Sequence, residues 1–173
     1  KSLKGRLREL GDSKVASVTR DTSRGERASI VATADFVFHL AGINRPKTDH
    51  EFVSGNVQFT EALCVALAAS GRKPPIVYAS STQATLDNAY GRSKLAAEQV
   101  LLRHGEASGS QVVVFRLPNV FGKWCRPNYN SVVATFCHQI CRGLPVTIND
   151  GAAPLRLVYI DDVVGAFGGL LRM

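Results

Sequence analysis

Short apolar segments that alternate with helix-length segments constrain the fold more than any other feature of this sequence. Residues 35–40 form a nearly continuous apolar run that ends before Gly42, which is typical of a strand covered on both faces. In residues 51–69 the apolar side chains recur at helical spacing, and Gly71 follows them. The alternation predicts an α/β fold with a doubly wound parallel sheet, in which the carboxyl ends of the strands form one rim.

The remaining segments fit the same alternation, and we expect one domain over residues 1–173. The proportions, 45% hydrophobic and 20% charged residues, are those of a globular protein and exclude a disordered tail or a coiled coil. Further strands are expected at 15–19, 76–80, 112–117, 146–148 and 157–160, and helices at 3–10, 89–103, 131–142 and from 161 onward; residues 28–33 fit either.

The ends of the chain and its charge bear on location and partners. No apolar run is long enough to cross a bilayer and no signal peptide is recognisable, so a cytoplasmic protein is expected, beginning inside a longer gene product because Met is missing at position 1. The net charge of +7 is dispersed along the chain, which favours small phosphate-bearing ligands over nucleic acid. Cys137 and Cys141 fit small buried helix residues better than a metal site, and no metal is expected.

A phenol and an ammonium four residues apart are the strongest chemical signal. Tyr90 and Lys94 share one face of the helix expected at 89–103, although such a pair alone is a weak motif. Three strand ends strengthen it, because hydroxyls, small residues and polar groups stand where each strand stops. These strand ends are Ser80-Ser81-Thr82, His39-Leu40-Ala41-Gly42 and Arg116-Leu117-Pro118-Asn119.

This ordered set resembles the extended short-chain dehydrogenase/reductase family, the NAD(P)-dependent epimerases, dehydratases and reductases of nucleotide sugars. The resemblance runs from about residue 34 to residue 164, and the segments 42–46, 86–94 and 121–131 are similar to the reductase domain of the CapF-like capsular polysaccharide enzymes. It implies a Rossmann-like fold and reduction of the 4-keto group of a UDP-linked 6-deoxy-hexosamine.

Two parts of that family's pattern are missing. The family opens with a strand and a Gly-x-x-Gly-x-x-Gly turn that binds the cofactor pyrophosphate, and no such turn occurs here. We therefore expect the first strand and its turn to be absent, and the isolated chain to bind NADP(H) weakly. The cupin domain that follows the reductase domain in CapF-like enzymes has no counterpart here either.

The resemblance assigns the catalytic roles. It implies Tyr90 and Lys94 as the catalytic pair and Ser81 beside the substrate carbonyl, with Thr82 as the alternative for that third role. In this interpretation Lys94 lowers the pKa of the Tyr90 phenol and reaches the ribose of the nicotinamide, while Tyr90 donates its proton to the carbonyl oxygen. Ser81 hydrogen-bonds the same oxygen as charge develops.

The cofactor is expected to be NADP, with NAD possible. Both Arg20 and Asp21 follow the strand expected at 15–19, with Arg24 close by. A guanidinium there suits a 2′-phosphate, whereas an acidic residue suits a 2′-hydroxyl. The expected cofactor-binding residues are Arg20, Asp21, Leu40, Ala41, Gly42, Tyr90, Lys94 and Pro118.

The substrate side is less constrained. Asn119 fits a hydrogen bond to sugar or phosphate but also a plain strand-end cap, and Arg116 could neutralise phosphate or pair with Asp161 or Asp162. His39 is expected to be packed near the cofactor and to act as neither acid nor base. The expected substrate-binding residues are Thr82, Asn119, Lys123, Arg126 and Arg156.

Two alternatives remain open at this point. A nucleotide-sugar 4-epimerase or dehydratase of the same family uses the same Ser81, Tyr90 and Lys94. The second alternative is a non-catalytic NAD(P)-binding protein, and the presence of all three residues argues against it because such a protein does not need them. A homodimer with a UDP-sugar as its small-molecule substrate is expected, without nucleic acid or membrane.

Overall fold

The chain folds into two compact units, each of which is described by itself. The computed structural model describes residues 2–9, 11, 14–19, 21–148, 150–152 and 154–172. The first unit, here the sheet unit, spans Ala16–Leu117, and the second unit comprises Lys1–Val15 and Pro118–Met173. The single domain expected over residues 1–173 stays a prediction.

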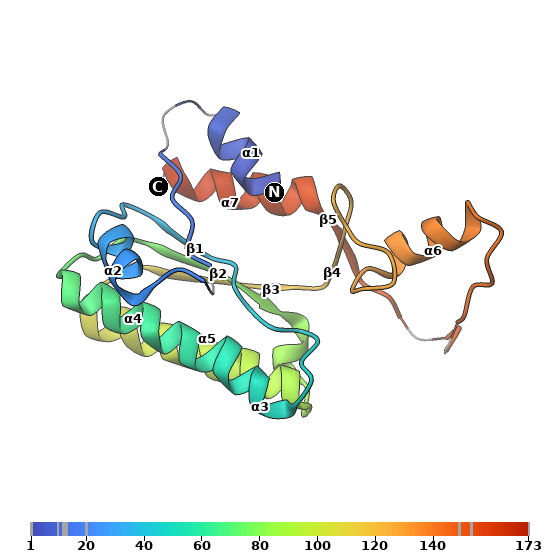
Figure 1. The fold of residues 1–173 in the computed structure, drawn as a ribbon, viewed down its shortest axis with the longest axis horizontal. Helices are drawn as coiled ribbons and strands as arrows, with labels where there is room; N and C mark the ends of the chain where they lie inside the picture. The colour runs from blue at the N-terminus through green and yellow to red at the C-terminus, as the bar shows by residue number, and fades with distance from the viewer. Residues whose placement is uncertain are drawn as a thin grey trace. The chain divides into compact units, whose positions relative to one another are not determined.

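A three-stranded parallel sheet forms the centre of the sheet unit (Figure 1). Its order is β1 (Val37–His39), β2 (Ile76–Ser81) and β3 (Val112–Leu117). Val37 pairs with Ile76, and Ile76 pairs with Val112, so the three strands end at the same edge. The parallel arrangement confirms the predicted α/β class, and it follows from strands rich in valine and aromatic residues that are separated by helices.

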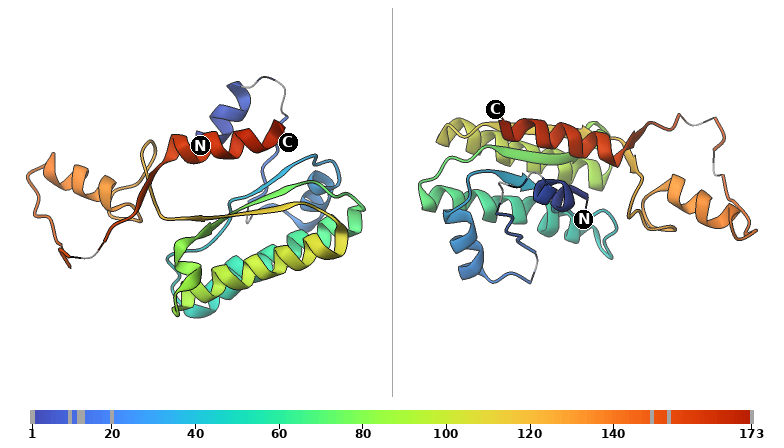
Figure 2. Two further views of the ribbon diagram at one scale, coloured as in Figure 1. Left: turned by 180° about the vertical axis from the view of Figure 1, so that it is seen from behind. Right: turned by 90° about the horizontal axis from the view of Figure 1, so that it is seen from above.

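Two long helices lie side by side along one face of this sheet (Figures 1 and 2). They are α4 (Phe59–Ser70) and α5 (Ala89–Ser108). α4 continues a helical stretch that begins with α3 (Asp49–Phe52) and the π-helix η1 (Val53–Gln58). Their apolar faces build the core of the unit with the strands and with Val31 of the helix at Arg24–Ala32, through Val31, Leu63, Leu67, Ile76, Tyr78, Ala97 and Leu101.

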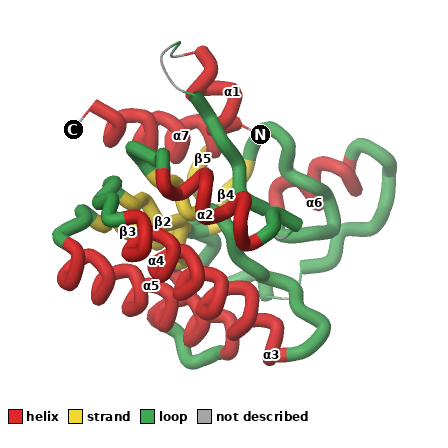
Figure 3. The backbone as a smooth tube through the Cα atoms, turned by 60° about the vertical axis from the view of Figure 1, so that its left-hand side comes forward, coloured by secondary structure: helices red, strands yellow, loops and turns green. Residues whose placement is uncertain are grey.

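The stretch Asp49–Ser70 has the length and composition of a membrane span, although this is weak evidence by itself. In the sheet unit its Leu63 and Leu67 are buried in the core beside β2. An irregular connection, residues 40–48, leads from β1 to α3 (Figure 3). The stretch therefore contributes buried side chains to the core of an α/β unit.

Local signals explain where the helices begin and end. α2 (Arg24–Ala32) forms over the segment that the sequence left open, because Ser23 and Glu26 make a reciprocal capping box at its start. α4 ends at Gly71, whose φ of 68° is the left-handed conformation that glycine adopts without strain.

In the residues that the structure describes, the second unit has a short sheet and four helical segments. β4 (Asn119–Phe121) pairs in parallel with β5 (Leu157–Tyr159), and Asn119 stands opposite Leu157. α1 contacts α7, and the buried Leu3 and Leu7 lie on α1. The helical segments are α1 (Ser2–Glu9), α6 (Val132–Ile140), α7 (Ile160–Gly169) and the 3₁₀ turn η3 (Leu170–Arg172).

Two expected strands are wrong, and so is the burial of two cysteines. Residues 15–19 and 146–148 are irregular, because no described strand lies beside either segment and a strand needs a neighbour for its backbone hydrogen bonds. β1 is the edge strand of the described sheet, with β2 as its partner there. Cys137 and Cys141 are exposed on and after α6, contrary to the expectation that they are buried.

Candidate active site

The first turn of α5 carries Tyr90 and is fixed by its cap and by a close approach. The side chain of Asn88 caps the helix, with its Oδ1 accepting a hydrogen bond of 2.7 Å from the Gly91 amide. A Cβ atom at Gly91 would collide with the carbonyl oxygens of Gln83 and Leu86. Glycine thus lets the 3₁₀ turn η2 (Thr82–Thr85) lie directly against α5.

This contact brings Ser81 and Tyr90 together. Ser81 ends β2, and its Oγ accepts a hydrogen bond of 3.2 Å from the Gln83 amide. Its side chain also hydrogen-bonds the Tyr90 phenol, which lowers the pKa of Tyr90, but burial of the phenol outweighs this and raises the pKa. The pKa of Tyr90 is thus raised, contrary to the expected lowering, and the phenol is protonated at neutral pH.

Lys94 lies one turn beyond Tyr90 with its ammonium inside the protein. The side chain is buried, and its Nζ donates a hydrogen bond of 2.8 Å to the Ala79 carbonyl. Nζ also lies 4.2 Å from the centre of the Tyr78 ring, a cation–π contact. Burial lowers the pKa of Lys94 to about 8, while the charge of Glu98 acts in the opposite direction.

Arg116 pairs with Glu98, and this corrects the expectation that it might pair with Asp161 or Asp162. Its Nη2 lies 2.7 Å from Glu98 Oε2, and this bond raises the pKa of Arg116. Asp161 instead pairs with Lys123 in the second unit, with 3.1 Å between Lys123 Nζ and Asp161 Oδ2. That ion pair raises the pKa of Lys123.

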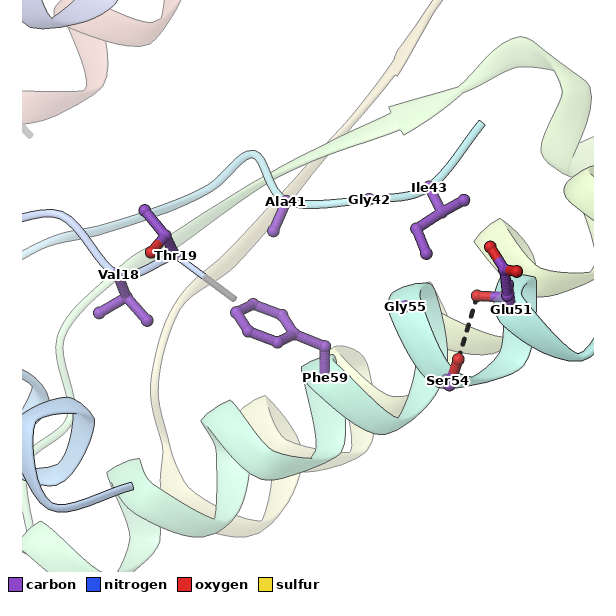
Figure 4. Close-up of a pocket in the computed structure, with 9 residues that line it drawn as sticks. All are labelled: Val18, Thr19, Ala41, Gly42, Ile43, Glu51, Ser54, Gly55 and Phe59. Carbon is purple, nitrogen blue, oxygen red and sulfur yellow. Dashed lines mark hydrogen bonds between the residues drawn. The ribbon is translucent and has the colours of Figure 1, made fainter. Parts of the chain in front are cut away.

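A cavity of about 280 Å³ opens beside the end of β1 (Figure 4). Ala41 and Gly42, two of the residues expected to bind cofactor, line it together with Val18, Thr19, Ile43, Glu51, Ser54, Gly55 and Phe59. A Cβ atom at Gly42 would lie 3.0 Å from Asn56 Oδ1 and 3.6 Å from Lys94 Nζ, so the glycine lets the backbone pack closely against both side chains.

Asn56 is a functional candidate that the sequence reasoning missed. It is 1% exposed in the π-helix η1, and its Oδ1 accepts a hydrogen bond of 2.6 Å from the Ile43 amide. Its Nδ2 donates to the Ile43 carbonyl at 3.0 Å and to Ser93 Oγ at 2.9 Å, and Ser93 Oγ donates to the Tyr90 carbonyl at 2.7 Å. Asn56 thus joins the cavity wall to the helix of Tyr90. The signal that could have found it is a polar amide two residues before Gln58 at a helical spacing of four from the apolar Phe52, which places it on the buried face.

His39 is buried at the end of β1, as expected, and is held neutral. Its Nε2 lies 2.8 Å from Thr60 Oγ1, and that hydroxyl donates to the Asn56 carbonyl at 2.6 Å. Because the hydroxyl has only one proton, Nε2 of His39 is the donor in the first bond. Burial and the charge of Lys94 lower the pKa of His39 to about 4. The imidazole is therefore a packed hydrogen-bond donor.

The other predicted residues are distributed as follows. Arg20 lies outside the described residues, and Asp21, Leu40 and Thr82 are exposed in the sheet unit. The second unit contains the other five, Pro118, Asn119, Lys123, Arg126 and Arg156. There the backbone amide of Asn119 donates a hydrogen bond of 3.2 Å to the Arg156 carbonyl. Across the described part of the chain, no group of three or more metal-ligating side chains lies together.

Comparison with known proteins agrees with this geometry. The model of the NAD dependent epimerase/dehydratase family matches residues 11–173. The chain is 52% identical over 167 residues to a UDP-2-acetamido-2,6-beta-L-arabino-hexul-4-ose reductase from Pseudomonas aeruginosa, covering 96% of the chain and 45% of that protein.

Solved structures give the same result for the fold. The capsular polysaccharide assembling protein CapF from Staphylococcus aureus matches with a TM-score of 0.86 and 44% identity, over 99% of this chain and 46% of that one. A UDP-glucose 4-epimerase from Thermotoga maritima shares the fold with a TM-score of 0.81 at 23% identity, over 99% of this chain and 69% of that one. The chain thus spans about half the length of the first two relatives. The predicted family resemblance and the Rossmann-like fold are confirmed.

Proposed function

The chain belongs to the NAD dependent epimerase/dehydratase family, and from this premise we propose that it carries the reductase site of a nucleotide-sugar enzyme. The reaction is the NADPH-dependent reduction of the 4-keto group of a UDP-linked 6-deoxy-hexosamine in capsular or O-antigen polysaccharide biosynthesis. The observation that carries this proposal is the Tyr90 phenol, hydrogen-bonded to Ser81 and followed one turn later by the buried Lys94. The name of the 52% identical relative, a UDP-linked hexulose reductase, supports the substrate class.

Tyr90 is the proton donor in this mechanism. When bound, NADPH supplies a hydride to the carbonyl carbon, so the carbonyl oxygen needs one proton to become the hydroxyl of the product. The raised pKa keeps the Tyr90 phenol protonated at neutral pH, ready to donate. Ser81 accepts or donates a hydrogen bond at the phenol and can turn its hydroxyl to the same oxygen.

Lys94 stabilises the phenolate that remains after proton donation. Its ammonium is one helical turn from Tyr90 and close to the backbone of Gly42. In a buried site an ammonium stabilises a nearby anion much more strongly than it does in water. Because this Nζ lies close to Gly42, which lines the cavity, we assign it to the nicotinamide ribose as well.

The choice of NADP over NAD is part of the proposal. Arg20 is the residue that would pair with a 2′-phosphate, assisted by Arg24 at the start of α2, whereas Asp21 would favour a 2′-hydroxyl. Leu40, Ala41, Gly42 and Pro118 complete the proposed cofactor contacts. Thr82, Asn119, Lys123, Arg126 and Arg156 remain the proposed substrate contacts.

We propose the cytoplasm as the compartment of the reaction, from the sequence and from the state of the cysteines. Cys64, Cys125, Cys137 and Cys141 are free thiols, which fits a reducing compartment and hence the cytoplasm. The homodimer stays a prediction.

The test is net consumption of NADPH by the full-length protein with a UDP-linked 4-keto-6-deoxy-hexosamine. Tyr90→Phe should lower kcat about 100-fold or more with little effect on folding, since only the proton donor is lost. Tyr159→Phe is the matched control, because it also removes a phenol and keeps the ring contact with Phe121. A Tyr90→Phe variant with more than half the wild-type activity would overturn the assignment. Interconversion of two sugar epimers without net NADPH loss would identify the 4-epimerase instead.

A further inference from the structure

Glu98 is a buried carboxylate that the proton transfer does not use. It lies on α5 four residues after Lys94 and eight after Tyr90, so the three side chains share one side of the helix. Glu98 is only 3% exposed. A buried carboxylate costs several kcal/mol of solvation, roughly, unless charged and hydrogen-bonding partners compensate it.

Its partners come from two neighbouring strands at the same level of the sheet. Arg116 Nε lies 3.1 Å from Oε1 and 3.2 Å from Oε2, and Arg116 Nη2 lies 2.7 Å from Oε2. The Ser80 hydroxyl donates a further hydrogen bond to Oε1. Ser80 of β2 and Arg116 of β3 are register partners, so two adjacent strand ends hold one carboxylate of α5.

This arrangement connects the parts of the candidate active site. Ser80 directly precedes Ser81 on β2, and Glu98 is on the helix of Tyr90 and Lys94. A bond from Ser80 to Glu98 therefore fixes how far β2, which carries Ser81, stands from the helix that carries Tyr90. Hydrogen bonds to a charged group are stronger than neutral ones, which makes this a stiff connection.

The charge of the carboxylate also acts on Lys94 and raises its pKa against the effect of burial. The titratable groups that interact with Lys94 are Glu98 from α5, Tyr78 from β2 and the neutral His39 from β1, and Tyr90 precedes it by one turn on α5. Asn56 faces the same region from η1 without a charge. Arg116, with 43% of its side chain exposed, offsets part of the charge of Glu98 from the β3 side.

We propose that Glu98, held by Ser80 and Arg116, is a positioning residue that fixes the Ser81–Tyr90 geometry and supplies the counter-charge of Lys94. The inference rests on the proposed reductase function for its effect on turnover. Its effect on Lys94 is a property of the protein alone.

The charge of Lys94 is measured by NMR in the full-length protein labelled with ¹³C at the lysine ε-carbon, with Lys94→Arg to assign the resonance. In Glu98→Gln the side chain keeps its shape but loses its charge, so the titration of Lys94 should move to lower pH by about one unit. In Arg116→Gln the charge of Glu98 is less compensated, so the titration should move to higher pH. Glu106→Gln, on an exposed part of the same helix, should leave it unchanged.

Shifts of the Lys94 titration in opposite directions in the two variants support the proposal. A purely structural ion pair would shift this titration in the same direction in both variants or leave it unchanged, and either result overturns the proposal.

Turnover is then measured against pH. In Glu98→Gln the loss of kcat at alkaline pH should begin about one pH unit lower than in the wild type, and KM for NADPH should change less than kcat. If the wild-type protein reduces no keto-sugar but the NMR shifts are opposite, the proposed function fails and the counter-charge role stands. If the protein is an active reductase but the shifts are absent, only this inference fails.

Discussion

Replacement of Asn56 by alanine tests whether one buried amide joins the cofactor cavity to the catalytic helix. The change removes hydrogen bonds of 2.6 Å and 3.0 Å to the backbone of Ile43 and one of 2.9 Å to Ser93. Each neutral bond contributes about 1 kcal/mol, and part-buried backbone groups left without partners add to the loss. The expected loss of unfolding free energy is thus about 2–4 kcal/mol, or a melting temperature lower by roughly 4–15 °C for a domain of this size.

The assay combines thermal unfolding with calorimetric titration of NADPH into the full-length protein. Gln58→Ala is the matched control, because Gln58 lies in the same π-helix but is exposed. NADPH should bind more weakly to Asn56→Ala than to the control, since Gly42 and Ile43 line the cavity that Asn56 holds in place. The reasoning is refuted if Asn56→Ala melts within about 1 °C of Gln58→Ala, or if it melts lower but binds NADPH with wild-type affinity.

Two further predictions address cofactor choice and pH. Arg20→Ala should weaken NADPH binding by about 10- to 100-fold and NADH binding much less, because only the 2′-phosphate loses a charge-assisted bond; equal losses in both titrations would show that Arg20 does not read the phosphate. The pKa of His39 is lowered from 6.5 to about 4 in the folded chain, so the unfolded chain takes up the proton first and stability falls as the pH drops from 6.5 towards 4. His39→Gln should flatten this part of a denaturation-versus-pH curve, which loses up to about 3 kcal/mol in the wild type, whereas the exposed His50→Gln should keep the wild-type slope.

The residues that could be predicted are those whose relation is local. Tyr90 and Lys94 are one turn apart in sequence and in space, and Ser81 is predictable as the last residue of an apolar strand. Glu98 lies on the same helix, but its link to Arg116 depends on the register of β2 and β3, which no local pattern contains. For the same reason the pairing of Arg116 with Asp161 or Asp162, one of the two alternatives that the sequence offers, is wrong.

The errors in secondary structure have a similar cause. Residues 15–19 and 146–148 have the alternation of strands, but a strand also requires a neighbouring backbone, and none is present in the described part of the chain. The direction of the Tyr90 pKa shift could not be predicted either. The spacing of four residues indicates that Lys94 lies one turn from Tyr90. The burial that raises the pKa of Tyr90 depends instead on tertiary packing against Phe52 and the rest of the site.

The contact at Gly91 ties the length of a connection to the identity of one amino acid. With eight residues between Ser81 and Tyr90, the chain must fold back so closely that position 91 meets the backbone of residues 83 and 86 and tolerates no side chain. An insertion in that connection would let the backbone swing away and release position 91 to vary. During divergence the two changes are therefore expected to occur in a fixed order: the longer loop comes first, and the loss of glycine follows. Gly91→Ala paired with short insertions after Ala84 would reconstruct that order in the laboratory.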